Sequence, residues 1–126
     1  IISKIFNAKK LNQNFVELWG DGTPTRDFLY CDDAANGLIL SAEKYNKTEP
    51  INLGSGEETS IVNLTKLIMK LMNADLEIKW NTSMPNGQPR RCVSYDKANH
   101  DIDFKPNTSL KKGLQKTIEW YELSKN

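Results

Sequence analysis

Short runs of β-forming residues alternate along this chain with stretches of helical periodicity, and this alternation limits the folds it can adopt. Phe15 to Trp19 and Leu76 to Trp80 alternate apolar and polar side chains, which predicts two strands. Apolar residues recur at helical spacing across 61–71 and 110–121, which predicts helices that each bury one face. Short strands alternating with helices predict a layered α/β fold, and 126 residues are enough for one domain.

Weaker signals complete the predicted order of elements. Residues 1–12 have the pattern of an amphipathic helix, and residues 95–101 suit one or two helical turns. Asp27 to Cys31 and Pro50 to Leu53 are predicted to form two more strands. Three helix caps are also predicted. Asp32 or Asp33 should cap a helix that runs through Tyr45, and Thr59 or Ser60 should cap the helix that follows. Asn107 or Thr108 should cap the last helix.

The charge balance and the cysteine count argue against several classes of protein. Seventeen Lys and Arg against sixteen Asp and Glu give a net charge of +1, so no basic surface for nucleic acid is expected. The longest apolar run is about four residues, far short of a membrane span or a signal-peptide core. Cys31 and Cys92 are too few for a disulfide framework, which favours a reduced, cytoplasmic protein.

The chain begins without a signal for the start of a helix. Ile1, Ile2, Ile5 and Phe6 lie at helical spacing from the first residue, but no capping residue precedes them. The first residue is also not Met. We therefore expect this sequence to be part of a longer chain.

Arginine is rare in this sequence and is confined to two loops. The chain has fourteen Lys but only three Arg, and Arg26, Arg90 and Arg91 all lie in segments marked by Pro and Gly. The planar guanidinium offers a rigid fork of donors that suits a phosphate or a carboxylate. This distribution favours a role of the arginines in binding an anion. The alternatives are that the three arginines cluster by chance, or that Arg91 is only a surface residue.

The first arginine segment runs from Trp19 through a turn-rich loop to Arg26. An exposed indole can stack on a ring, and a guanidinium can bind an anion through two hydrogen bonds, so the pair suits a nucleotide diphosphate. The structural alternative is an aromatic ring at the edge of the core, with Arg26 paired to Asp27 or Asp33.

The second arginine segment is Pro85-Asn86-Gly87-Gln88-Pro89-Arg90-Arg91. Its two prolines and its glycine fix a loop that presents two adjacent arginines. Adjacent side chains on an extended segment point to opposite sides, so one of the two is expected to face a ligand shared with Arg26. The alternative is a solvated basic loop.

Three other patterns resemble functional motifs but have simpler explanations. Gly54-Ser55-Gly56 follows a predicted strand, yet Thr59 occupies the third glycine position of a dinucleotide loop, so a turn before a helix explains it. Tyr121 and Lys125 have the spacing of a dehydrogenase catalytic pair, but no cofactor motif precedes them. His100 is the only histidine, and no metal or catalytic group assembles around it. We therefore predict no catalytic residue and no metal ligand in this chain.

Four segments, taken in order, resemble the substrate-binding part of one enzyme family. They are Trp19 to Ala34, Asn52 to Ile61, Pro85 to Arg91, and Thr108 to Tyr121. They are similar to segments of the extended short-chain dehydrogenases, the NAD(P)-dependent nucleotide-sugar epimerases, dehydratases and reductases. The resemblance implies a Rossmann-type α/β fold. It also implies that residues 1–126 are a single C-terminal substrate-binding domain without the N-terminal dinucleotide-binding domain.

One branch of the family shares further features with this sequence. Lys9 to Asn14 and the Asn86-to-Arg90 loop are similar to the NADP-dependent 3,5-epimerase/4-reductases that act on GDP-4-keto-6-deoxy-mannose. The resemblance implies a GDP-sugar substrate that contacts Trp19, Arg26, Asn86 and Arg90, with Arg26 near the pyrophosphate. Asn86 stands where that branch usually has Asp, so a UDP- or dTDP-sugar epimerase or dehydratase is the alternative.

The family's catalytic groups are not in this sequence in their usual context. The resemblance places the glycine-rich loop and the catalytic Tyr-x-x-x-Lys set upstream of Ile1. It therefore implies that NADP is bound mainly by the N-terminal part, that the full enzyme is a homodimer, and that this chain alone is inactive. The remaining alternative is a non-catalytic module that binds a nucleotide sugar.

Overall fold

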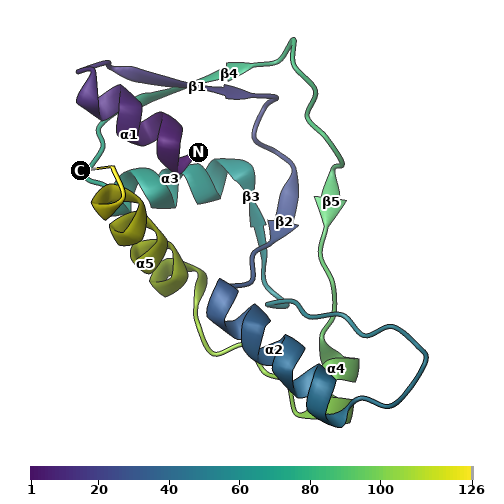
Figure 1. Cartoon of the computed structure of the whole chain (residues 1–126). Coiled ribbons are helices and arrows are strands. Elements are labelled where there is room, and N and C mark those ends of the chain that lie inside the picture. Colours follow the sequence, from purple (N-terminus) through teal and green to yellow (C-terminus); the bar gives the residue numbers. More distant parts are fainter. Residues whose placement is uncertain (126) are drawn as a thin grey trace.

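The computed structural model describes residues 1–125, with helices at both ends and short strands between them (Figure 1). The elements are α1 (Ile2–Lys10), β1 (Phe15–Trp19), β2 (Thr25–Asp27), α2 (Cys31–Lys44), β3 (Glu58–Ser60), α3 (Ile61–Leu71), β4 (Glu77–Asn81), β5 (Arg90–Arg91), α4 (Asp96–Ile102) and α5 (Leu110–Leu123). Helices α1, α3 and α5 lie at one end with β1 and β4, while α2 and α4 lie at the other. The predicted α/β fold is confirmed.

The strands form two small sheets. Strands β1 and β4 pair in parallel, with Phe15 opposite Glu77 and Trp19 opposite Asn81. Strand β2 is the middle strand of the other sheet, antiparallel to β3 and parallel to β5. Each sheet therefore joins segments that are far apart in the sequence.

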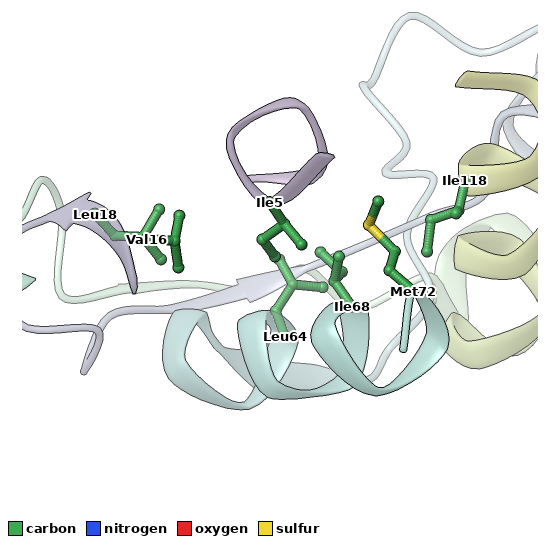
Figure 2. Close-up of a cluster of buried hydrophobic side chains, with 7 residues drawn as sticks. All are labelled: Ile5, Val16, Leu18, Leu64, Ile68, Met72 and Ile118. Carbon is green, nitrogen blue, oxygen red and sulfur yellow. The ribbon is translucent and has the colours of Figure 1, made fainter. Parts of the chain in front are cut away.

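The larger core lies between α1, α3, α5 and the sheet of β1 and β4 (Figure 2). Alternation along β1 buries Val16 and Leu18 and leaves Phe15, Glu17 and Trp19 on the outer side. The buried members of this core are Ile5, Val16, Leu18, Leu64, Ile68, Met72 and Ile118. The strand periodicity that predicts β1 thus also predicts which side of it is buried.

A smaller core lies between α2 and α4. Ala98, Ile102 and Phe104 are completely buried there. Helix α2 packs closely against Leu53 and Phe104 because Gly37 has no side chain. A Cβ at position 37 would lie 2.8 Å from Leu53 Cδ1 and 2.9 Å from Phe104 Cε2. A larger residue at position 37 would have to push these apolar groups apart.

Two of the predicted strands are wrong in position. The strand predicted for Asp27 to Cys31 is instead β2 at Thr25–Asp27, and Cys31 is already the first residue of α2. Pro50 to Leu53 forms no strand, and the nearest one is β3 at Glu58–Ser60. Both predictions rest on runs of apolar residues. Ile51 and Leu53 do pack against the smaller core, but they do so from a loop rather than from a strand.

The predicted caps are correct for one helix and wrong for two. Ser60 caps α3 by accepting from Asn63 N at 3.3 Å, which confirms the prediction. Helix α5 is capped by Ser109, one or two residues beyond the predicted Asn107 or Thr108. Neither predicted aspartate caps α2, which begins after Tyr30 without a side-chain cap.

Asp33 instead joins α2 to the segment that precedes α5. Its buried carboxylate accepts hydrogen bonds from Asn107 N at 3.2 Å and from Thr108 N at 2.8 Å. A carboxylate that accepts two backbone N–H groups satisfies donors that would otherwise be costly to bury. This contact fixes where the chain enters α5.

We expect Asp33→Ala to lower the free energy of unfolding by about 2–3 kcal/mol, because two N–H groups lose a charged acceptor. Urea denaturation followed by circular dichroism would measure the change. The matched control is Asp32→Ala, whose side chain is 69% exposed and lies 3.7 Å from Lys116. That substitution should cost less than about 0.5 kcal/mol. Equal effects of the two substitutions would contradict the role of Asp33.

Candidate functional site

The loop between β1 and β2 lies against the loop between β4 and β5. Asp21 N donates to Asn86 Oδ1 at 2.9 Å, and Thr25 N donates to Pro89 O at 3.0 Å. Gly20 has a φ of +76°, and a Cβ there would lie only 2.1 Å from Asn86 Oδ1. The two arginine segments of the sequence therefore meet at one place in the fold.

Arg26 is half-buried in the middle strand of this junction. Its Nη1 donates to the carbonyl of Thr25 at 2.6 Å, and a Cβ on Gly87 would lie 3.5 Å from its Nη2. The expected acidic alternatives are engaged elsewhere, because Asp27 and Asp33 accept from backbone N–H groups of other segments. Within residues 1–125 Arg26 forms no ion pair.

Arg90 is held by the carboxylate of Glu58, a residue that belongs to no motif in the sequence. Its Nε donates to both oxygens of Glu58, at 3.0 and 2.9 Å, and its Nη2 lies 2.9 Å from Glu58 Oε2. The hydroxyl of Thr25 also donates to Glu58. No local pattern identifies Glu58, because its role depends on strands β2, β3 and β5 lying side by side.

This contact shifts the pKa values of both partners. The pKa of Glu58 is lowered, first by the hydrogen bond from Arg90 and then by the one from Thr25. The pKa of Arg90 is raised by the same hydrogen bond and by the charge of Glu58. Both groups are therefore charged at neutral pH, and the pair fixes β5 against β3.

Trp19 ends strand β1 just before the first of these loops, and Asn86 lies in the second. The indole of Trp19 is 58% exposed, and Lys4 Nζ lies 5.8 Å from its ring centroid. Asn86 uses its Oδ1 to hold Asp21, while its Nδ2 makes no hydrogen bond within residues 1–125. A hollow of about 410 Å³ lies between the two loops, lined by Gly20, Asp21, Thr82, Ser83, Met84, Pro85 and Asn86. The junction thus offers an exposed aromatic face, a free amide donor and a guanidinium.

The Gly54-Ser55-Gly56 turn is filled by a carboxylate of the chain itself. Asp27 accepts from Ser55 N at 2.9 Å and from Gly56 N at 3.4 Å. The N–H groups that would meet a phosphate in a dinucleotide loop are therefore directed at Asp27. This supports the interpretation of the turn as structural.

The other motif-like residues have packing or surface roles. Tyr121 donates to Ser3 Oγ at 2.9 Å and packs edge-on against Phe6, which joins α5 to α1. His100 is exposed beside Asp101.

Among the described residues, no cluster of three or more His, Cys, Asp or Glu side chains could hold a metal ion. Over the same range no helix is long and apolar enough to cross a bilayer.

Comparison with known proteins connects this geometry to a family. Residues 1–54 match the NAD dependent epimerase/dehydratase family. A UDP-glucose 4-epimerase from Thermotoga maritima superposes with a TM-score of 0.86 and 25% identity, over 99% of this chain and 40% of that one. A GDP-L-fucose synthetase from Naegleria fowleri gives a TM-score of 0.89 and 26% identity, over 98% and 38%. The chain therefore has the Rossmann-type α/β fold of these extended short-chain dehydrogenases, and its first 54 residues resemble the NAD dependent epimerase/dehydratase family.

Over nearly its whole length the chain also resembles GDP-L-fucose synthases. It is 38% identical to the enzyme of that name from Sinorhizobium fredii, over 94% of this chain and 38% of the relative. It is 35% identical to probable GDP-L-fucose synthase 1 of Oryza sativa, over 96% of this chain and 37% of the relative. The chain thus spans well under half the length of the curated relatives it matches.

We expect the titration of Glu58 to report its contact with Arg90. In the wild-type chain the carboxyl of Glu58 should titrate below its ordinary pKa, because the charged form accepts the hydrogen bonds. Arg90→Ala should raise this pKa, since the first cause of the shift is removed. Thr25→Ala should raise it less, and Lys116→Ala serves as a remote control.

Side-chain carboxyl NMR as a function of pH would measure these midpoints. A Glu58 pKa that is unchanged by Arg90→Ala would show that the two groups do not interact in solution.

Proposed function

We propose that this chain is the nucleotide-sugar-binding part of an NADP-dependent epimerase/reductase of the GDP-L-fucose synthase type. The reaction proposed for the whole enzyme is the 3,5-epimerisation and 4-reduction of GDP-4-keto-6-deoxy-mannose. The observation that carries the proposal is Arg26, a half-buried guanidinium without an ion-pair partner in residues 1–125, where the two arginine loops meet. The similarity to GDP-L-fucose synthases favours the GDP-sugar.

Each predicted contact has a distinct task in this proposal. Arg26 binds the diphosphate, because a guanidinium can make two parallel charge-assisted hydrogen bonds to phosphate oxygens. The exposed ring of Trp19 offers an apolar face to the substrate. The loop that carries Asn86 and Arg90 covers the nucleotide from the other side. The contact of Asn86 with Asp21 supports this task, because it anchors that loop to the segment that leads to Arg26.

The residues of this chain do not suit a dinucleotide site of their own. Asp27 occupies the N–H groups of the Gly54-Ser55-Gly56 turn, which is the turn most like a phosphate loop. We therefore assign NADP and the catalytic residues to another part of a longer protein, with residues 1–126 as one substrate-binding domain. In this proposal the chain alone has no turnover.

The resemblance further supports a homodimer, and the free thiols of Cys31 and Cys92 support a cytoplasmic location.

A different nucleotide sugar is the second candidate. The chain is 32% identical over 110 residues to a dTDP-4-dehydro-6-deoxy-D-allose reductase from Streptomyces. The solved UDP-glucose 4-epimerase with UDP-glucose shares its fold. These relatives favour the same diphosphate contact with a nucleotide sugar that has another base. The remaining alternative is a non-catalytic module that binds a nucleotide sugar, and such a module would need no catalytic domain elsewhere in the protein.

A ligand-observed NMR screen would separate these candidates. We expect the chain to bind GDP and GDP-mannose in preference to UDP-glucose, and not to bind NADPH. A preference for UDP-glucose would favour the second candidate. Binding of NADPH by this chain would contradict the proposed division between substrate and cofactor parts.

We expect Arg26→Ala to weaken nucleotide-sugar binding by about 1.5–3 kcal/mol, the range for hydrogen bonds to a charged group. Isothermal titration calorimetry with GDP-mannose would measure the change. Arg26→Lys keeps the charge but loses the fork of donors, so it should recover only part of the affinity. Lys47→Ala, which removes a cation outside the junction, is the matched control. Equal affinities for wild type and Arg26→Ala would remove Arg26 from the site.

A further inference from the structure

The chain contains two Asn-Gly dipeptides, in very different settings. Asn86 and Gly87 lie in the loop between β4 and β5, whereas Asn36 and Gly37 lie in helix α2. Because glycine has no Cβ, its backbone nitrogen can approach the side-chain amide of the preceding asparagine without steric hindrance. The two dipeptides share this local chemistry, so the fold around them decides whether either one reacts.

The backbone around Gly87 is open. Asn86 and Gly87 are both exposed and belong to no helix or strand. Gly87 has a φ of +76°, and its N–H donates no hydrogen bond within residues 1–125. Beyond the two chain neighbours, the one atom within 4 Å of a Cβ placed on Gly87 is Arg26 Nη2, at 3.5 Å. The nitrogen of Gly87 is thus neither engaged in a hydrogen bond nor enclosed by other groups.

The side-chain amide of Asn86 is polarised by a contact with the neighbouring loop. Its Oδ1 accepts a hydrogen bond from Asp21 N at 2.9 Å. A nucleophile that adds to Cγ places negative charge on Oδ1, and a backbone N–H at this distance stabilises such a charge. The hydrogen bond from Asp21 therefore favours attack on Cγ of Asn86.

The dipeptide in α2 is held in a conformation that opposes the same reaction. Asn36 and Gly37 lie inside this helix, where the N–H of Gly37 belongs to the helical series of hydrogen bonds. Gly37 is also buried, against Leu53 and Phe104. Attack on Asn36 requires this backbone to leave its helical conformation, so α2 must first open locally.

We infer that Asn86 is a site of spontaneous deamidation in the folded chain, and that α2 protects Asn36. The nitrogen of Gly87 forms a bond to Asn86 Cγ while the bond from Cγ to Nδ2 breaks. Nδ2 leaves as ammonia, with the proton that the Gly87 nitrogen gives up, and a cyclic succinimide remains. Water then opens the ring at either carbonyl. One opening gives aspartate, and the other gives isoaspartate, in which the main chain runs through Cγ.

Both products change the candidate site. Each adds a carboxylate to the lining of the hollow between the two loops. Aspartate keeps an oxygen in place of Asn86 Oδ1, so the hydrogen bond from Asp21 N is retained. Isoaspartate lengthens the main chain by a methylene and moves the carboxylate, so this contact between the loops is lost. The reaction needs only the dipeptide and water, so the inference does not depend on the proposed function.

Peptide mapping by mass spectrometry, after incubation of the purified chain at mildly alkaline pH, tests this inference. We expect Asn86 to deamidate at least about tenfold faster than Asn36, because Asn36 reacts only when α2 opens. In the urea-denatured chain the two rates should become similar, since both sites are Asn-Gly. Gly87→Ala should slow the reaction at Asn86 by about tenfold, because a Cβ hinders the attacking nitrogen. Asn86→Asp supplies the reference for the aspartate product, and isoaspartate is identified as the isomer that separates from it.

Three results would overturn the inference. They are equal rates at Asn86 and Asn36 in the folded chain, an unchanged rate at Asn86 in Gly87→Ala, and an Asn36 that stays unreactive in urea. In the last case the fold would not be the cause of the difference. Circular dichroism confirms that Gly87→Ala is folded, and Gly87→Ser replaces it if it is not. Titration with GDP-mannose is a separate measurement, and its failure would count against the proposed function alone.

Discussion

The pairing of β2 on both of its edges is the constraint on which the rest of the candidate site depends. This strand is only three residues long, yet it bonds to β3 on one side and to β5 on the other. The β3 pairing sets Glu58 beside Thr25, and the β5 pairing decides which arginine shares a face with Arg26. Without either partner strand the three arginines would be loop residues without fixed directions.

The carboxylate of Asp27 keeps this short strand in place at its end. It accepts from the backbone of the Ser55-Gly56 turn, so it links the end of β2 to the loop that leads into β3. Gly54 is needed for the close approach, because a Cβ there would lie 2.6 Å from Asp27 Oδ2 and 2.5 Å from Val93 Cγ2. The turn that resembles a phosphate-binding loop in the sequence thus binds a carboxylate of the chain itself, that of Asp27.

The sequence predicts the parts of the fold that have strong local periodicity. Strands β1 and β4 and helix α3 carry five to eleven residues of regular pattern; β1 and α3 have the predicted bounds, and β4 is shifted by one residue. Strands β2, β3 and β5 have two or three residues each, too few for a pattern, and they form only because distant segments meet. The sequence could therefore single out the arginine loops but could not predict the contact between Glu58 and Arg90. Which of Arg90 and Arg91 shares a face of the sheet with Arg26 depends on register, which no local signal specifies.

The adjacent arginines of strand β5 lie on opposite faces of the sheet, and only Arg90 forms an ion pair within residues 1–125. Arg90 fixes β5 through a contact that involves two nitrogens and both oxygens of Glu58, which restricts the backbone that carries Arg91. Arg91 is paired with Arg26 in the register of the sheet, and both side chains are positively charged. The Glu58–Arg90 contact thus stabilises one face of the sheet and fixes the strand that carries Arg91 on the other.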